Sequence, residues 1–259
     1  MKASSFVIGT VLLCLATTVA FAQKLGNRPV TLDPKEGERR AGVLVTEMLS
    51  QKPDQNVTNT GVMTIRDGEG NRREVKVKFG IRVEGSKILS IYDGLGSDGG
   101  GTRLTVIHSD NAPNQYRVEN FGAGNATANS KTLSGKEAII PFAGSDFWLA
   151  DLGLEFLHWP QQRILRTNSI RHNQSCSVLQ SINPDPGSGG YARVESWIDI
   201  EAPHGVVHAD AYGSNGKRVK QFDPKSVKKI EGQYKLEAME MLDEKSGSRT
   251  VIKFDLRSD

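Results

Sequence analysis

Alternation of polar and apolar side chains runs through the last quarter of the chain and constrains its fold more than any other feature. The odd-numbered residues from Tyr191 to Asp199 alternate with the even-numbered residues from Ala192 to Ile200, and a second alternating run covers Thr250 to Leu256. A period of two residues is typical of strands with one face in a core and one in water. The segment from Tyr191 to Phe254 therefore predicts an antiparallel meander. Its apolar face is expected to be buried, either in a core or along the wall of a cavity.

Earlier segments extend the predicted sheet. A hairpin is expected from Val57 to Val83 around the turn Asp67–Asn71, followed by strands near 88–92, 104–108 and 116–120. The stretch Gly122–Lys136 is rich in small and polar residues and predicts a mobile loop.

A helix is expected before the sheet. Asp33 can cap its start, Pro34 suits the first helical position, and Lys52-Pro53 ends it. Its apolar residues fall on one face: Ala41, Leu44, Val45, Met48 and Leu49. This face predicts a helix packed on the sheet, with a lid over a cavity as an open possibility.

The centre of the chain, Phe142 to Pro160, concentrates aromatic and leucine residues without a period of two. This pattern favours short helical turns laid across the mouth of a sheet. Ordinary filling of a core is the alternative interpretation.

The first 22 residues have the features of a secretory signal peptide. Lys2 precedes an apolar stretch from Phe6 to Val19, and Ala20-Phe21-Ala22 forms a small-x-small cleavage site. We expect cleavage after Ala22, a periplasmic product and one domain over 23–259; an uncleaved anchor is the alternative. Cys176 is then the sole cysteine, so no internal disulfide is expected.

Composition and motifs favour a protein that is not an enzyme. A net charge of +3 is too small to indicate nucleic acid as the main partner. Gly94–Gly99 matches a dinucleotide-binding pattern, but a strand follows it, so a hairpin loop is the better interpretation. His172 with Cys176, and His204 with His208, are each four residues apart on expected strands, too far to act together. We therefore predict no catalytic residue, no cofactor and no metal site.

Several motifs resemble the family of outer-membrane lipoprotein-sorting proteins. They are Gly144–Leu152 and Leu154–Pro160 in the centre of the chain. In the closing strands they are Tyr191, Trp197-Ile198-Asp199, Gly216-Lys217 with Lys220, Gly232, Met239 and Met241. The resemblance implies a mainly β, LolA/LppX-like fold, in which helices cover the mouth of a strongly curved antiparallel sheet that forms an incomplete β-barrel. It also implies a periplasmic carrier of lipoprotein acyl chains or other lipids. A protein-binding or envelope-stress-sensing module on the same fold is the alternative, and a secreted hydrolase is a third hypothesis.

The carrier hypothesis requires an apolar cavity and a lid. The candidate lid residues are Leu44, Val45 and Met48, and Arg82 is the candidate for a polar gate. The candidate lining residues are Phe79, Ile81, Ile91, Phe142, Phe147, Trp148, Leu152, Phe156, Trp197 and Ile252. An error in strand parity would move some of these to the outer face. The expected partners are acyl chains of lipids or lipoproteins, together with transfer proteins of the inner and outer membranes. No nucleic acid is expected, and we expect a monomer.

Overall fold

The computed structural model describes residues 14–15, 28–53, 56–97, 99–109, 112–122, 127–201, 203–230 and 233–256. Except for Cys14–Leu15, the predicted signal peptide and its cleavage site lie outside these ranges. Within them, no helix reaches the length and apolar character that a membrane crossing requires.

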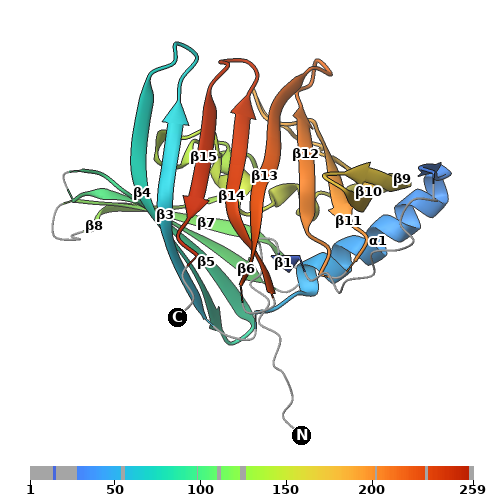
Figure 1. Cartoon of the computed structure of the whole chain (residues 1–259), viewed down its shortest axis with the longest axis horizontal. Helices are drawn as coiled ribbons and strands as arrows, with labels where there is room; N and C mark the ends of the chain where they lie inside the picture. Colours follow the sequence, from blue (N-terminus) through green and yellow to red (C-terminus); the bar gives the residue numbers. More distant parts are fainter. Residues whose placement is uncertain are drawn as a thin grey trace, which may run out of the picture.

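One large antiparallel sheet organises the molecule (Figure 1). Its strands are β1 (Cys14–Leu15), β2 (Val30–Thr31), β3 (Val57–Arg66), β4 (Arg72–Glu84), β5 (Lys87–Leu95), β6 (Gly101–Ser109), β7 (Ala112–Phe121), β8 (Thr127–Ser134), β9 (Gln161–Arg171), β10 (Gln174–Ile182), β11 (Arg193–Asp199), β12 (Val206–Tyr212), β13 (Arg218–Ile230), β14 (Gln233–Asp243) and β15 (Arg249–Phe254).

The strand order is β2-β9-β10-β11-β12-β13-β14-β15-β3-β4-β5-β6-β7-β8, with β1 pairing β14. The predicted closing meander is therefore confirmed as five neighbouring strands, and β15 then joins the hairpin formed by β3 and β4. Strands β2 and β8 are the two ends of this order and do not pair with each other in the described sheet. The sheet is thus an incomplete barrel, as predicted.

Helix α1 (Pro34–Ser50) begins where the sequence predicts. The Asp33 side chain accepts a hydrogen bond from the Glu36 N–H at 3.2 Å, and Pro34 occupies the first helical turn. Four apolar residues of one face are buried: Ala41, Leu44, Val45 and Met48. Gly37 lets the helix approach β9 closely, since a Cβ at this position would lie 2.5 Å from the carbonyl oxygen of Ile164.

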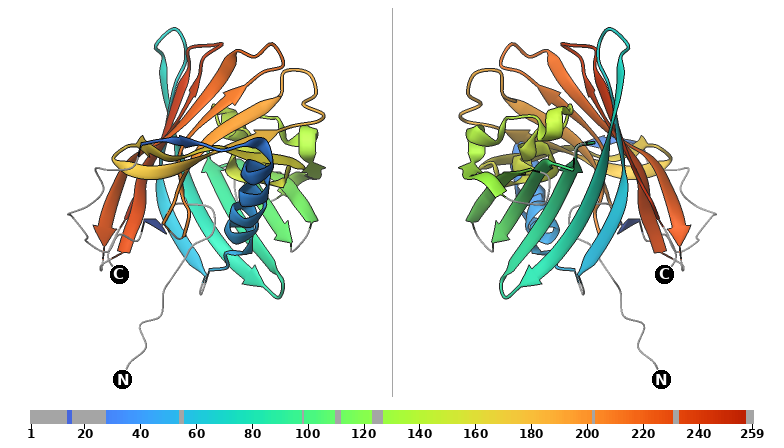
Figure 2. Two further views of the ribbon diagram at one scale, coloured as in Figure 1. Left: turned by 90° about the vertical axis from the view of Figure 1, so that its right-hand side faces the viewer. Right: turned by 90° about the vertical axis from the view of Figure 1, so that its left-hand side faces the viewer.

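The aromatic centre of the chain forms short helical turns, as predicted. They are η1 (Gly135–Ala138), η2 (Phe142–Gly144), α2 (Leu149–Leu152) and η3 (Glu155–His158). Figures 1 and 2 show these turns behind β13–β15, on the inner side of the curved sheet, with β5–β8 also on that side. Phe142, Phe147 and Leu152 of this segment are buried and pack with apolar residues of β3–β7, β14 and β15.

The prediction of a mobile loop over Gly122–Lys136 is wrong for Thr127–Ser134, which forms strand β8. Thr127–Ser134 pairs with β7 along most of its length, from Phe121↔Thr127 to Gln115↔Ser134. The sequence shows no clear apolar alternation here, because an edge strand with exposed Asn129, Ser130 and Lys131 does not need an apolar face.

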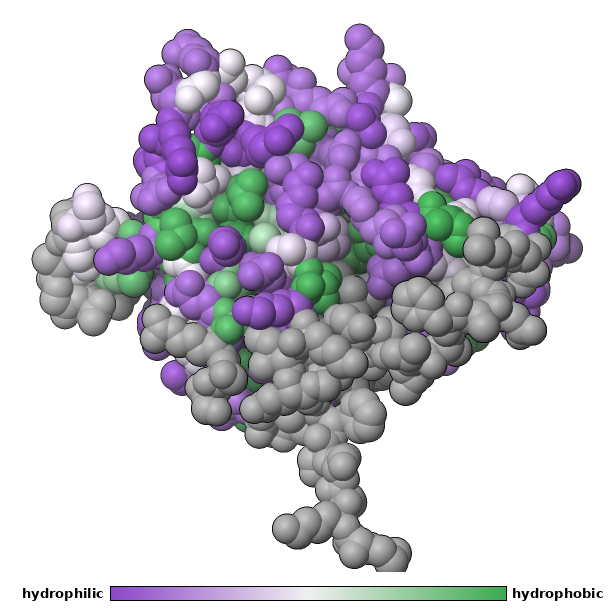
Figure 3. Space-filling view, viewed as in Figure 1, coloured by the Kyte–Doolittle hydropathy of each residue, from purple (hydrophilic) through white to green (hydrophobic). Residues whose placement is uncertain are grey.

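The inner face of the sheet carries two separate hydrophobic clusters. The first is centred on β3–β7, β14, β15 and the turns η2 and α2, and the second joins α1 and η3 to β9–β12. The outer face visible in Figure 3 is mostly hydrophilic over the strands that are coloured there. The alternation in the sequence therefore separates an apolar inner face from a polar outer face, but the inner face does not pack into one core.

Candidate ligand cavity

A cavity of about 860 Å³ lies between the two hydrophobic clusters. This volume is within the range of ~300–1,000 Å³ that is usual for small-molecule sites. Most of the lining is apolar: Met48, Ile88, Tyr92, Phe147, Leu152, Leu154, Phe156, Leu157, Tyr191, Val194, Val206, Ala209, Ala211, Phe222, Met239 and Met241. The inward side chains thus surround an open space.

Strand register explains how these side chains meet. Val194 on β11 faces Ala211 on β12, and Ala209 faces Phe222 on β13, so each pair shares the inner face. The methyl groups of Ala209 and Ala211 leave room where longer side chains would fill the space. Their small size is therefore a direct cause of the cavity.

A buried polar group lies in the cavity wall. Lys220 is 2% exposed, and its Nζ donates to the carbonyl oxygen of Asp146 at 2.5 Å and lies 3.7 Å from Oδ2 of Asp151. The same ammonium lies 3.7 Å from the centre of the Trp148 ring, which stacks on Tyr191 at 4.5 Å.

Asp151 contacts other members of this polar group. Its Oδ2 accepts hydrogen bonds from the Trp148 N–H at 2.8 Å and the Tyr191 hydroxyl at 3.2 Å. Burial raises the pKa of Asp151 although Lys220 opposes that shift, and burial lowers the pKa of Lys220 although Asp151 opposes it. The wall therefore offers one cation, one carboxylate and one hydroxyl at a single point of an apolar cavity.

A second polar network supports the opposite wall. His108, which lines the cavity, contacts Ser90 Oγ at 3.1 Å through Nε2 and Asn114 Oδ1 at 2.8 Å through Nδ1. Asn114 donates to the Gly153 carbonyl oxygen at 2.7 Å, and Tyr116 donates to Glu155 at 2.6 Å. Burial lowers the pKa of His108 to about 4, so the neutral ring bridges β5, β6 and β7.

The rim of the cavity is polar and partly exposed. It comprises Ser50 and Gln51 at the end of α1, Ser86 in the turn between β4 and β5, Ser109 at the end of β6, and His204 before β12. The Gln51 amide donates to the Pro203 carbonyl oxygen at 2.6 Å, which ties the end of α1 to the segment before β12.

The structure brings part of the predicted lining together. Phe147, Leu152 and Phe156 line the cavity, and so does Met48 from the predicted lid. The other inward residues lie next to the cavity in the clusters that flank it: Phe79, Ile81, Phe142 and Ile252 in the first, and Leu44 and Val45 in the second, with Trp148 packed against it.

Two predicted lining residues, and the predicted gate, lie on the outer face. Ile91 pairs with Gly80, while its neighbour Tyr92 points inward. Trp197 pairs with His208, whereas Val194 points inward. Arg82 is exposed and borders an outer hollow together with Ile91. These assignments are corrected, because a shift of one residue along a strand reverses the face of a side chain.

Sequence reasoning missed the polar residues of the cavity. Lys220 has a detectable signal, since it shares strand parity with Phe222 and is therefore a lysine on an apolar face. Asp151 and His108 have no such signal, because their partners come from distant parts of the chain.

Among the described residues, one group could hold a metal ion: His172, His208 and Asp223. It lies on the outer face and does not line the cavity. The prediction that no metal site exists took account of spacing along the chain only, and these three residues come from separate parts of the sheet.

Solved structures define the class of fold. A putative outer membrane lipoprotein-sorting protein domain from Vibrio parahaemolyticus is similar with a TM-score of 0.68 and 19% identity, over 86% of this chain and 92% of that chain. A DUF1329 family protein from Desulfovibrio piger has a TM-score of 0.67 and 20% identity, over the same shares. A LolA superfamily protein from Nitrosomonas europaea has a TM-score of 0.56 and 15% identity, over 85% of this chain and 94% of that chain. The chain has a LolA-like fold.

A family model described as "-like: Uncharacterized protein" matches residues 125–257, just over half of the chain. The chain belongs to this family. No curated protein matches it.

Proposed function

We propose that this protein carries lipids or the acyl chains of lipoproteins through the periplasm, without catalysing a reaction. The observation that carries the proposal is the cavity of about 860 Å³ between two apolar clusters. Each methylene group moved from water into such a space contributes roughly 0.8 kcal/mol, so a long acyl chain has a large driving force to enter.

Two further observations support this proposal. The Vibrio parahaemolyticus neighbour, whose fold is similar, is described as a putative lipoprotein-sorting domain. Residues 1–22 of this chain carry the sequence pattern of an export signal. Both agree with a carrier that works between two membranes and receives its cargo from membrane transfer proteins.

The polar group in the wall gives the ligand an orientation. An acyl chain linked as an ester or amide has a carbonyl oxygen at one end, and Lys220 is a donor in the cavity wall, whereas the Tyr191 hydroxyl donates to Asp151. We infer that the carbonyl end lies near Lys220, while the hydrocarbon extends along Phe147, Met239 and Met241.

Helix α1 is the candidate lid. Met48 reaches the cavity from this helix, and Ser50 and Gln51 at its end lie on the rim. Movement of the end of α1 away from Pro203 would widen the entrance, and would break the hydrogen bond from Gln51.

The experiment that tests the proposal uses native mass spectrometry and displacement of a fluorescent fatty acid. We expect the purified protein to bind one or a few long-chain lipids. Ala211→Phe, which adds a ring inside the cavity, should weaken probe binding by tenfold or more, on the order of 1.4 kcal/mol. Val62→Phe adds the same ring type on an exposed position of β3 and should bind as the parent does.

Two results would contradict the proposal. One is a parent protein that binds neither natural lipid nor probe. The other is equal probe affinity in Ala211→Phe and the parent, with both folded by circular dichroism. Either result would favour a protein-binding module on the same fold.

A further inference from the structure

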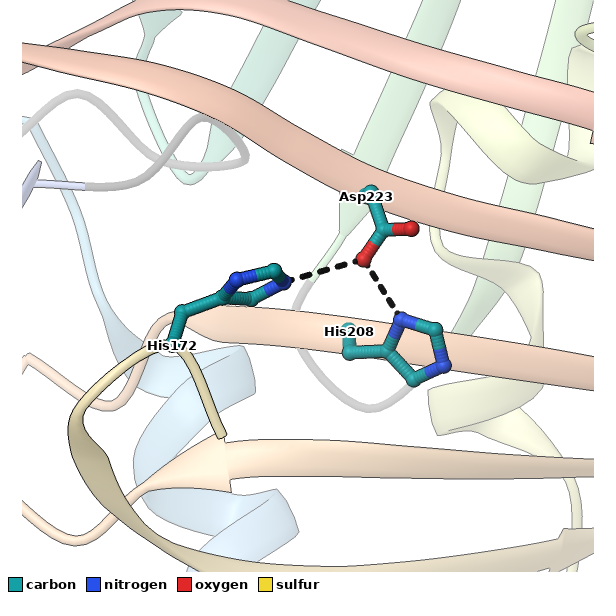
Figure 4. A group of neighbouring side chains, drawn as sticks. All are labelled: His172, His208 and Asp223. Carbon is teal, nitrogen blue, oxygen red and sulfur yellow. Dashed lines mark hydrogen bonds and ion pairs between the residues drawn. The ribbon is translucent and has the colours of Figure 1, made fainter. Parts of the chain in front are cut away.

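Three side chains from separate elements converge on the outer face of the sheet (Figure 4). His172 lies in the turn between β9 and β10, His208 on β12 and Asp223 on β13. Asp223 Oδ1 lies 2.7 Å from His208 Nδ1 and 3.1 Å from His172 Nε2, and the ligand atoms all lie within 4.8 Å of one another. Two imidazole nitrogens and one carboxylate oxygen therefore face a common point.

Neighbouring groups fix the orientation of two of these side chains. Asp210 Oδ1 lies 3.3 Å from the other ring nitrogen of His208, and Arg218 donates to Asp210 at 3.0 Å. Gln221 donates to Oδ2 of Asp223 at 2.6 Å, which directs Oδ1 toward the histidines. A carboxylate behind a histidine and a donor behind a carboxylate are the supports that metal ligands commonly have in proteins.

Two of the three side chains are buried, and the third is open to solvent. The side chains of His208 and Asp223 are 1% and 8% exposed, whereas that of His172 is 50% exposed. The Trp197 ring covers His208 edge-on at 4.9 Å between ring centres. An ion could thus enter from the side of His172 and reach ligands that are already positioned.

Arg171 is the group that an ion would displace. Its Nη2 lies 3.0 Å from His208 Nδ1 and 3.9 Å from Asp223 Oδ1. Its buried Nε has no hydrogen-bond partner among the described residues, and 36% of the side chain is exposed. A bound ion would take over the contacts of the guanidinium with His208 and Asp223, and turning it toward solvent would also remove it from the Trp197 ring, 5.6 Å away.

We propose that His172, His208 and Asp223 bind a divalent transition-metal ion of the Zn²⁺ class, with a water molecule as the fourth ligand. Two nitrogens and one oxygen suit Zn²⁺, whose bonds of ~2.0–2.2 Å place tetrahedral ligands about 3.4 Å apart. The ligand atoms lie 2.7 and 3.1 Å from Asp223 Oδ1 and within 4.8 Å of one another, so binding requires small shifts of the side chains. The ion would tie the β9–β10 turn to β12 and β13. This inference is independent of the lipid cavity, which lies on the other face of the sheet.

The test is a titration of the chelator-treated full chain with Zn²⁺, followed by calorimetry and thermal melting. We expect one equivalent of Zn²⁺ to bind and to raise the melting temperature, and Co²⁺ to give the visible absorption of a tetrahedral site. His172→Asn removes a ligand in an exposed turn, and asparagine tolerates the positive φ of 47° found there. This variant should weaken Zn²⁺ binding by about tenfold or more, at a level seen for disturbed metal sites.

Two further variants keep the test decisive. Asp223→Asn should weaken binding as His172→Asn does, while His204→Ala, a histidine on the cavity rim, should bind as the parent does. The proposal is overturned if the folded parent takes up no Zn²⁺ at ~100-fold excess. It is also overturned if His172→Asn binds Zn²⁺ with the parent's affinity, and the cluster is then an ion-paired network only.

Discussion

Single residues set the chemistry of the cavity, and Lys220 is the clearest case. A lysine with 2% exposure is stable only when partners replace its hydration, and here these are the Asp146 carbonyl oxygen, the Asp151 carboxylate and the Trp148 ring. Removing either charge would leave the other buried without its partner, at a cost larger than the net value of the pair. A charged pair in an apolar cavity is thus more consistent with orienting a ligand than with adding stability.

His108 makes a prediction about acid sensitivity at the residue scale. Its native pKa of about 4 lies below the unfolded value near 6.5, so the unfolded state takes up the proton first as pH falls. The stability that neutral His108 contributes is complete above pH 6.5 and is lost as the pH falls toward 4. The loss should reach about 3 kcal/mol, from roughly 1.4 kcal/mol per pKa unit.

Urea unfolding of the parent and of His108→Gln between pH 7 and pH 4 checks this prediction. Glutamine keeps a donor and an acceptor near Ser90 and Asn114 but does not titrate. The unfolding free energy of the variant should fall less steeply with decreasing pH. Parallel curves for the two proteins would show that His108 does not contribute to acid sensitivity.

At the scale of elements, the position of α1 against β9 depends on one glycine. A Cβ at Gly37 would lie 2.5 Å from the Ile164 carbonyl oxygen and 2.9 Å from Arg163 Cγ, and the backbone atom cannot move aside easily. Gly42, on the same helix, has open space at its Cβ position. The two glycines therefore allow a matched comparison within one element.

We predict opposite effects for the two alanine substitutions. Gly37→Ala should destabilise the protein by roughly 1–3 kcal/mol, because the helix must move off the sheet. Gly42→Ala should stabilise it by about 0.5–1 kcal/mol, because alanine favours the helix. Chemical denaturation measures both values. Equal changes of the same sign would contradict the close approach of α1 to β9.

A second consequence concerns the lid. If α1 covers the cavity, Gly37→Ala should also alter the affinity for the fluorescent fatty acid, whereas Gly42→Ala should leave it unchanged. The first effect separates a helix that covers the ligand from one that only packs on the sheet.

At the scale of the whole molecule, the open sheet encloses a space between two cores. One half of the sheet supplies Ile88 and Tyr92 to the cavity wall, and the other half supplies Val194 and Ala211. The segment from Phe142 to His158 lies between the halves (Figure 2) and contributes Phe147 and Phe156 to the cavity wall. The two halves are joined through the pairing of β15 with β3. The ends of the strand order, β2 and β8, do not pair with each other in the described sheet.

An apolar cavity of fixed size predicts how affinity depends on chain length. Each added methylene should improve binding about fourfold, from roughly 0.8 kcal/mol per group, until the hydrocarbon fills the cavity. Beyond that length the affinity should level off. A series of saturated fatty acids in the displacement assay measures this dependence, and an affinity that does not change with chain length would contradict burial of the tail.

Local patterns in the sequence were sufficient for much of the fold. The cap at Asp33, the apolar face of α1, the hairpin around Asp67–Asn71 and the closing meander are each encoded within short segments. Their physical basis is the period of a helix or a strand, which a sequence displays directly. The edge strand β8 lacks that signal, because its exposed polar residues need no buried face.

The sequence by itself determined most of the strands, the start and end of α1 and the presence of an apolar inner face. Only the tertiary structure decided which side chains border the empty space, since a shift of one residue placed Ile91 and Trp197 outside. It alone brought Lys220 to Asp151, and His172 to His208 and Asp223, across many residues of chain. The reason is physical: periodicity is local, whereas a cavity or a cluster of polar groups depends on register between strands that are distant in sequence.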